Sequence, residues 1–272
     1  MSNDSSKAAS SADSTLTQGQ EQERIPTSHV AWGPGTAILY GFLGAAIGVQ
    51  VLLQFAVVFF MMALGMNESA ISSWMSTISG QFIYTAAAEV SMFAAIFLYL
   101  TSRNASLRSI GLAKPRPSYI GIALLGVIVY FALYMLAVVI VSVFLPSIDL
   151  NQRQELGFNN AAGIAEYLMI FISLVVLPPI AEEVVFRGFI FSGLRSKLRF
   201  VPTALITSVL FAVLHLQFDS GAPLLWVAAI DTFILSFVLC FIREKTNSIW
   251  PTIGVHAIKN GIAFMLLYIF VQ

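Results

Sequence analysis

Long uninterrupted apolar runs dominate the sequence from residue 35 to its end. A helix that crosses a bilayer needs about 20 mostly apolar residues. Seven runs approach or exceed that length, at about 36–64, 80–101, 119–145, 171–194, 201–217, 223–242 and 249–271. A further helix-like segment, 161–170, either lies at the membrane interface or lengthens the fourth run. The sequence therefore predicts an all-α membrane protein, a polytopic bundle of seven or eight transmembrane helices.

The charge content excludes the main alternatives to a membrane protein. Only 10% of the residues are charged, whereas soluble domains carry about 25%. Lys and Arg number 14, as do Asp and Glu, so the chain lacks the basic excess of a nucleic-acid binder. The single cysteine, Cys240, excludes a disulfide framework and a cysteine zinc site. The predicted surroundings are the lipid bilayer, with no nucleic acid.

Polar residues divide the chain and orient it. Residues 1–30 are rich in Ser, Gln, Asp and Glu and have no apolar run, which predicts a disordered polar tail ahead of a transmembrane domain over 31–272. Basic residues gather in the tail and in every second loop: Lys7, Arg24, Arg103, Arg108, Lys114, Arg116, Arg195, Lys197, Arg199, Arg243 and Lys245. Cytoplasmic loops carry such an excess. We therefore expect a cytoplasmic N-terminus, and an integral protein of the cell membrane, in a bacterium the inner membrane.

Small residues in the first run predict a close helix contact. Gly41, Gly44 and Gly48 recur at helical spacing, and such a stripe lets two helix backbones approach.

Charged residues inside the apolar runs are the strongest functional signal, because charges at membrane depth are expensive and usually functional. The densest cluster follows the Pro178-Pro179 step and contains Glu182, Glu183 and Arg187. Glu183 and Arg187 are spaced i, i+4 and form a natural ion pair. Adjacent helical residues point about 100° apart, so Glu182 is free to act as a general base. The prolines interrupt the helical hydrogen bonds and can open room for water.

Two histidine elements lie in other runs. His215 is in the fifth run, and His256 and Asn260 share one face of the last run. Taken singly, each is more often an interhelical hydrogen bond than a catalyst. An imidazole and a carboxamide together offer donors that could hold an oxyanion.

The depths of the three elements agree if the fourth helix continues to Leu194. Glu182 is then about 18 Å, His215 about 21 Å and Asn260 about 16 Å from the inner end of its helix. A fourth helix that ended at Arg187 would separate them. The first alternative predicts one buried active site that opens toward the cytoplasm.

The three elements resemble the motifs of a known family. Glu-Glu-x-x-x-Arg at 182–187, Phe-x-x-x-His at 211–215 and His-x-x-x-Asn at 256–260 are similar to those of the CPBP intramembrane proteases, also called the Abi or CAAX prenyl protease 2 type. The resemblance covers about 170–265.

The resemblance implies an intramembrane endopeptidase acting on a membrane-associated substrate, a CAAX-like protein or another peptide precursor. It implies that Glu182 activates a water, that His215 orients this water, and that His256 and Asn260 stabilise the oxyanion. Glu183 and Arg187 would support these groups, and Phe211 would pack beside them.

Metal dependence stays open at this point. Glu182, His215 and His256 are acceptable zinc ligands, but the chain has no His-Glu-x-x-His helix. The resemblance favours water held by Glu and His without zinc.

Other functions and other charged residues give weaker signals. A non-catalytic immunity or scaffold protein on the same fold has no need of all these motif residues. A proton-coupled transporter would show paired broken helices, and the sequence has one proline break and no internal repeat. Glu89 and Asp231 are expected to make interhelical hydrogen bonds, with Glu89 the better candidate for lining a cavity. Lys259 is expected to snorkel or to pair with an acid.

Overall fold

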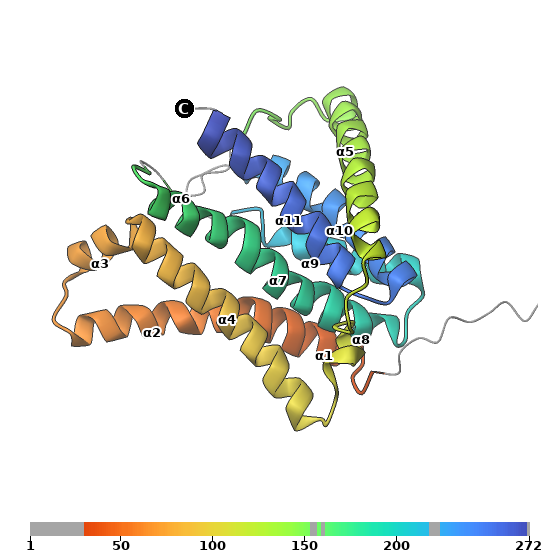
Figure 1. Cartoon of the computed structure of the whole chain (residues 1–272), viewed down its shortest axis with the longest axis horizontal. Coiled ribbons are helices and arrows are strands. Elements are labelled where there is room, and N and C mark those ends of the chain that lie inside the picture. Colours follow the sequence, from red (N-terminus) through yellow and green to blue (C-terminus); the bar gives the residue numbers. More distant parts are fainter. Residues whose placement is uncertain (1–29, 153–156, 159–160, 218–223, 271–272) are drawn as a thin grey trace, which may run out of the picture.

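The computed structural model of the chain describes residues 30–152, 157–158, 161–217 and 224–270 (Figure 1). These residues form helices and no strands, as predicted. The predicted polar tail lies outside the described residues, apart from Val30 at its end.

Eight continuous helices, some built from several labelled segments, account for most of the described residues. The first consists of α1 (Pro34–Thr36), η1 (Ala37–Gly48) and α2 (Val49–Ala63). The helix over the fourth predicted run, called the fourth helix below, consists of α6 (Ile164–Phe171), η3 (Ile172–Val176), α7 (Leu177–Glu183), η4 (Val184–Ile190) and α8 (Phe191–Arg195). The remainder are α3 (Glu68–Met75), α4 (Ile78–Ser102), α5 (Ser118–Phe144), α9 (Phe200–Val213), α10 (Trp226–Thr246) and α11 (Trp250–Phe264) with η5 (Met265–Phe270). The short 3₁₀ turn η2 (Leu107–Ile110) lies between α4 and α5.

Six of these helices are long and apolar enough to cross a membrane. The helix-like segment near 161–170 lengthens the fourth, which runs without a break over Ile164–Arg195. The fourth helix therefore continues past Arg187, which is the condition under which the three motifs share a depth.

The fifth predicted span is shorter than expected, because α9 ends at Val213 after 14 residues. The end tightens there: the backbone N–H of His215 donates to Ala212, and that of Leu216 to Val213, both at i−3. The His215 ring takes the Phe211 carbonyl that an α-helix would give to the His215 N–H. The prediction of a helix through 217 is wrong for this reason.

The helix over the sixth predicted run, α10, begins and ends later than predicted and includes Arg243 and Lys245, which were predicted to lie in a loop. Arg243 is 3% exposed. Its guanidinium donates to the Arg187 carbonyl, the Ser192 hydroxyl and the Asn247 side chain. It thus holds α10 against η4 instead of facing the solvent.

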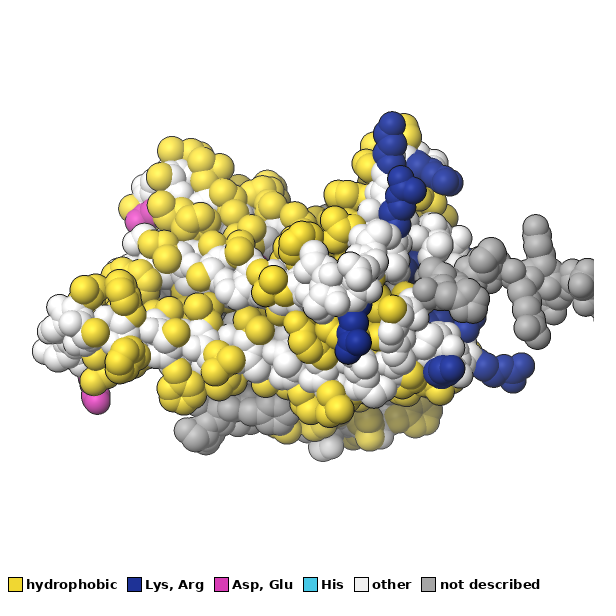
Figure 2. All heavy atoms as spheres, turned by 90° about the horizontal axis from the view of Figure 1, so that it is seen from below, with side chains coloured by type: hydrophobic (Ala, Val, Ile, Leu, Met, Phe, Trp, Pro, Cys, Tyr) yellow, Lys and Arg dark blue, Asp and Glu magenta, His cyan; other side chains and the backbone are white. Residues whose placement is uncertain are grey.

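The outer surface is apolar, as a lipid-facing surface must be. On α2 the side chains of Phe55, Phe59 and Phe60 are 69%, 76% and 63% exposed. Figure 2 shows hydrophobic side chains over much of one face, with Lys and Arg gathered toward one end and acidic side chains at the opposite end. Helix ends contribute to the basic end: α8 ends at Arg195, and α10 carries Lys245 in its last turn.

The glycine stripe of the first helix makes one close contact. A Cβ on Gly41 would lie 2.8 Å from Ile190 and from Phe189 of η4. Gly44 and Gly48 meet only the carbonyls of their own helix. The prediction holds at Gly41, and no such contact is found at the other two.

Candidate active site

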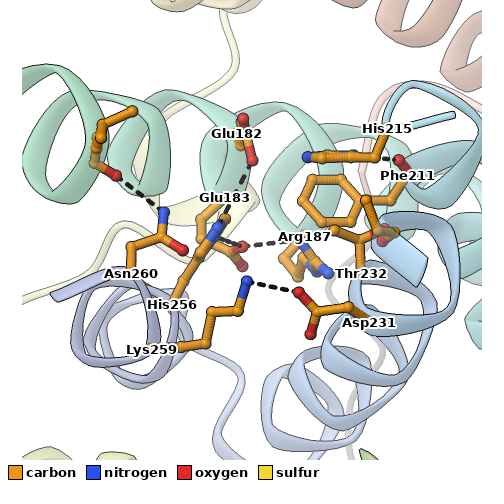
Figure 3. Close-up of polar contacts among 12 residues, drawn as sticks. Glu182, Glu183, Arg187, Phe211, His215, Asp231, Thr232, His256, Lys259 and Asn260 are labelled. Carbon is orange, nitrogen blue, oxygen red and sulfur yellow. Dashed lines mark hydrogen bonds and ion pairs between the residues drawn. The ribbon is translucent and has the colours of Figure 1, made fainter. Parts of the chain in front are cut away.

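The three motifs meet between the fourth helix, the end of α9 and α11. Glu182, Glu183 and Arg187 come from α7 and η4, His215 follows α9, and His256 and Asn260 come from α11. Figure 3 shows their side chains directed toward one another. Residues that are far apart in the sequence therefore form one polar cluster inside an apolar bundle.

Glu183 and Arg187 form the predicted ion pair. Arg187 Nη1 lies 2.7 Å from Glu183 Oε1, and both side chains are fully buried. The guanidinium carbon lies 4.7 Å from the centre of the Phe211 ring, which adds a cation–π contact. Phe211 thus packs beside the site, as the family resemblance implied.

Glu183 has a second partner that the sequence analysis did not predict. His256 Nδ1 lies 3.1 Å from the same Oε1. A carboxylate accepts the proton of this nitrogen, so the neutral ring carries its hydrogen on Nδ1. His256 Nε2 is left facing the site.

Glu182 is held differently from its neighbour. Its Oε2 has no hydrogen-bond partner among the described residues, and it lies 3.8 Å from His256 Nε2. That separation is too long for a direct hydrogen bond and allows both groups to bind one water. Glu182 thus lies outside the Glu183–Arg187 ion pair, and its role as a general base stays a prediction.

His215 completes this side of the site. Its Nδ1 lies 2.8 Å from the Phe211 carbonyl and donates to it, which leaves Nε2 as an acceptor. In Figure 3 this second nitrogen points toward Glu182.

Asn260 contacts the fourth helix one turn along α11 from His256. Its Nδ2 donates to the carbonyl of Leu174 in η3, at 2.9 Å. The motif predicted an oxyanion as the partner of this amide, and the contact with the Leu174 carbonyl was not predicted. The signal for it in the sequence is the proline pair at 178–179, which lies at i+4 and i+5 to Leu174.

Lys259 and Asp231 form a second ion pair, between α11 and α10, with 2.7 Å between Nζ and Oδ2. The Tyr130 hydroxyl of α5 also donates to Asp231. The expectations of an acid partner for Lys259 and an interhelical hydrogen bond for Asp231 are confirmed.

Glu89 on α4 is the remaining acid at this depth. Its Oε2 is buried without a hydrogen-bond partner among the described residues, and its carboxyl interacts electrostatically with Glu182. This placement supports a cavity-lining position, and no interhelical hydrogen bond of Glu89 is found in the described residues.

The candidate zinc ligands do not form a metal centre. Within the described part of the chain, no group of three His, Cys, Asp or Glu side chains is arranged to hold a metal ion. Glu182, His215 and His256 therefore do not fit as a three-ligand zinc set, and no metal enters the roles discussed below.

Comparison with known proteins identifies the family. Residues 164–262 match the family described as type II CAAX prenyl endopeptidase Rce1-like, and this segment contains all three motifs. The chain belongs to the Rce1-like type II CAAX prenyl endopeptidase family. The resemblance drawn from the motifs is thus confirmed.

Three relatives of this Rce1-like protein come from bacteria. "Putative membrane peptidase YdiL" of Bacillus subtilis (strain 168) is 37% identical over 93 residues, which are 34% of either chain. "UPF0177 protein YxdF" of Lactococcus lactis subsp. lactis (strain IL1403) is 30% identical over 143 residues, 52% of this chain and 75% of YxdF. "Uncharacterized protein YyaK" of Bacillus subtilis (strain 168) is 34% identical over 150 residues, 53% of this chain and 46% of YyaK. The matches therefore span about a third of YdiL and under half of YyaK. No solved structure gives a significant match.

Proposed function

We propose that this Rce1-like protein is an intramembrane endopeptidase in which Glu182 activates a water for attack on a peptide bond. The observation that carries the proposal is the position of Glu182: its Oε2 lies 3.8 Å from His256 Nε2 and the His215 ring points toward it (Figure 3), while the Nδ1 atoms of both rings are engaged elsewhere. A general base must lie within reach of the proton that it removes, directly or through one water. Family membership and the name of YdiL support the same reaction class.

The first step is the attack of water on the scissile carbonyl. Glu182 accepts one proton of this water while the water oxygen bonds to the carbonyl carbon. His215 Nε2 accepts a hydrogen bond from the same water and orients it. The carbonyl oxygen becomes an oxyanion.

His256 serves in both halves of the reaction. The proton taken by Glu182 passes to His256 Nε2, and Glu183 stabilises the resulting imidazolium through the Nδ1 contact. The imidazolium and Asn260 then stabilise the oxyanion. When the carbon–nitrogen bond breaks, His256 returns the proton to the departing amine.

The substrate class follows from the setting. The site lies inside a helical bundle with an apolar surface, so the proposed substrate is a membrane-associated protein or peptide, a CAAX-like precursor included. The proposed location is the inner membrane of a bacterium, with the basic end in the cytoplasm.

A comparison of membrane proteomes tests the proposal. Cells carrying Glu182→Gln should accumulate precursors that cells with the wild-type protein process, because an amide cannot take the proton from water. The matched control is Glu68→Gln, the same change at an exposed residue of α3. Processing by purified Glu182→Gln protein at the wild-type rate would contradict the assignment and favour a non-catalytic scaffold.

A further inference from the structure

The proline pair lies in the middle of a long helix, where proline is least expected. Pro178 and Pro179 lie within the Ile164–Arg195 helix one turn before Glu182, and the helix continues through them. Proline has no backbone N–H, so each removes one helical hydrogen bond. The carbonyls that lose their donors must find other partners.

The Leu174 carbonyl loses every donor that helical geometry can offer. The donor at i+4 would be Pro178 and the donor at i+5 would be Pro179, and neither has an N–H. The donor at i+3 is Leu177, whose N–H is engaged by the Ile172 carbonyl. Without a partner from another helix this carbonyl would stay unpaired at membrane depth, which is unfavourable by several kcal/mol.

Asn260 supplies the missing donor from α11, with 2.9 Å between its Nδ2 and the Leu174 oxygen. Only the NH₂ end of a carboxamide can donate to a carbonyl, so this contact fixes which end of the Asn260 side chain faces Leu174. The amide retains a second N–H in a fixed direction. One turn away on α11, His256 contacts Glu183, the residue that follows Glu182 in α7.

We propose that Pro178 and Pro179 turn the Leu174 carbonyl into a positioning group for Asn260. The proline pair then has a role besides bending the helix, because it reserves one backbone carbonyl for a side chain of another motif. Asn260 and His256 together fasten α11 to the fourth helix on either side of Glu182. The catalytic part of this inference rests on the proposed peptidase function, whereas the pairing itself does not.

A double-mutant cycle tests the pairing without a substrate. Pro178→Ala restores an N–H at i+4 to Leu174. Asn260→Ala should lower the thermal unfolding midpoint of the purified protein in detergent by at least about 2 °C, and clearly less in the Pro178→Ala background. Equal losses in both backgrounds would overturn the proposal. Pro179→Ala, which restores the donor at i+5, replaces Pro178→Ala if the latter does not accumulate.

The control is Pro251→Ala. Pro251 lies in the first turn of α11, where a helix needs no N–H, so the loss caused by Asn260→Ala should be unchanged in this background. A similar rescue by Pro251→Ala would contradict the proposal, because it would show a general effect of removing proline.

An activity arm uses a precursor identified by the proteome comparison. Pro178→Ala should lower kcat at least tenfold with little change in KM, because the new N–H competes with Asn260 for the carbonyl. If Pro178→Ala reduces the midpoint loss caused by Asn260→Ala but leaves kcat unchanged, the inference is limited to stability and its catalytic part is overturned. If the peptidase assignment is wrong, Glu182→Gln will process precursors at the wild-type rate. The midpoints of the double-mutant cycle do not depend on that result.

Discussion

Two adjacent glutamates, Glu182 and Glu183, have opposite surroundings in this protein. Glu183 Oε1 accepts from both Arg187 and His256 in a fully buried position, whereas Glu182 lies outside that ion pair, with its Oε2 3.8 Å from His256 Nε2. The difference follows from the 100° turn between successive helical residues. We therefore expect Glu183 to hold Arg187 and His256 in place and Glu182 to be available for chemistry.

The buried ion pair predicts a large loss of stability when one partner is removed. Arg187→Met leaves the Glu183 charge without its cation and should destabilise the protein by about 3–5 kcal/mol. Arg195→Met breaks the pair with Glu244, whose side chains are about a quarter exposed, and should lose less than the fully buried pair, about 1 kcal/mol. Reversible unfolding in mixed micelles measures both. Similar losses would show that burial does not set the strength of these pairs.

Local spacing explains which contacts the sequence predicts at this scale. The Glu183–Arg187 pair lies within one helix turn, so i, i+4 spacing is sufficient. The Asn260–Leu174 and His256–Glu183 contacts join residues 86 and 73 positions apart, and they depend on how α11 packs against the fourth helix. No spacing rule within one helix contains that information.

At the scale of helices, close packing depends on which glycine faces a neighbour. Gly41→Leu should reduce stability and accumulation in the membrane, because even its Cβ would come within 2.8 Å of Ile190 and Phe189. Gly44→Leu is the matched control, since a Cβ there meets only a carbonyl of its own helix at 3.4 Å. The thermal unfolding midpoints of the two purified variants measure this difference in stability. A Gly44 variant as unstable as the Gly41 variant would contradict it.

The Lys259–Asp231 pair connects α11 to α10 and predicts a compensating pair of mutations. Lys259→Met leaves the Asp231 carboxylate without its cation and should destabilise the bundle. Adding Asp231→Asn removes that charge and should recover part of the loss, because a neutral side chain is tolerated better at membrane depth. Unfolding midpoints of the single and double variants measure the recovery. A double variant that loses the sum of the single losses would argue against the pairing.

The lengths of the apolar runs predicted which segments form helices. They predicted the residues at which the helices end less well. α9 ends early because the His215 side chain competes for a backbone carbonyl. α10 continues to Thr246 and stops where Asn247 adopts a left-handed conformation, with φ of 50°. Hydropathy predicts which segments cross the membrane, whereas the hydrogen bonds of single residues determine where each helix ends.

For the whole molecule, the basic end predicts the orientation in the membrane. Lys197→Cys, between α8 and α9, should react with a membrane-impermeant maleimide only after the cytoplasmic side is opened. Ser72→Cys on α3 should react in intact cells. Both positions are exposed, and the native Cys240 is fully buried, so the background is low. The reverse pattern would place the N-terminus outside.

The general architecture could be predicted from the sequence, because scarce charge and long apolar runs leave few folds open. The division of the fourth helix into α-helical and π-helical segments could not be predicted from the sequence. The i+5 hydrogen bonds of η3 and η4 lie on either side of α7, and apolar length and charge do not predict them.

The short α9 also affects the lipid around the protein. Its 14 residues span about 21 Å, against a hydrocarbon layer of about 30 Å, whereas the 27 residues of α5 span about 40 Å. Val201, Leu205 and Val209 of α9 are exposed. We therefore expect lipids beside α9 to adjust to its length by shortening or tilting their acyl chains, which would leave a thinner bilayer next to the helix end that presents His215.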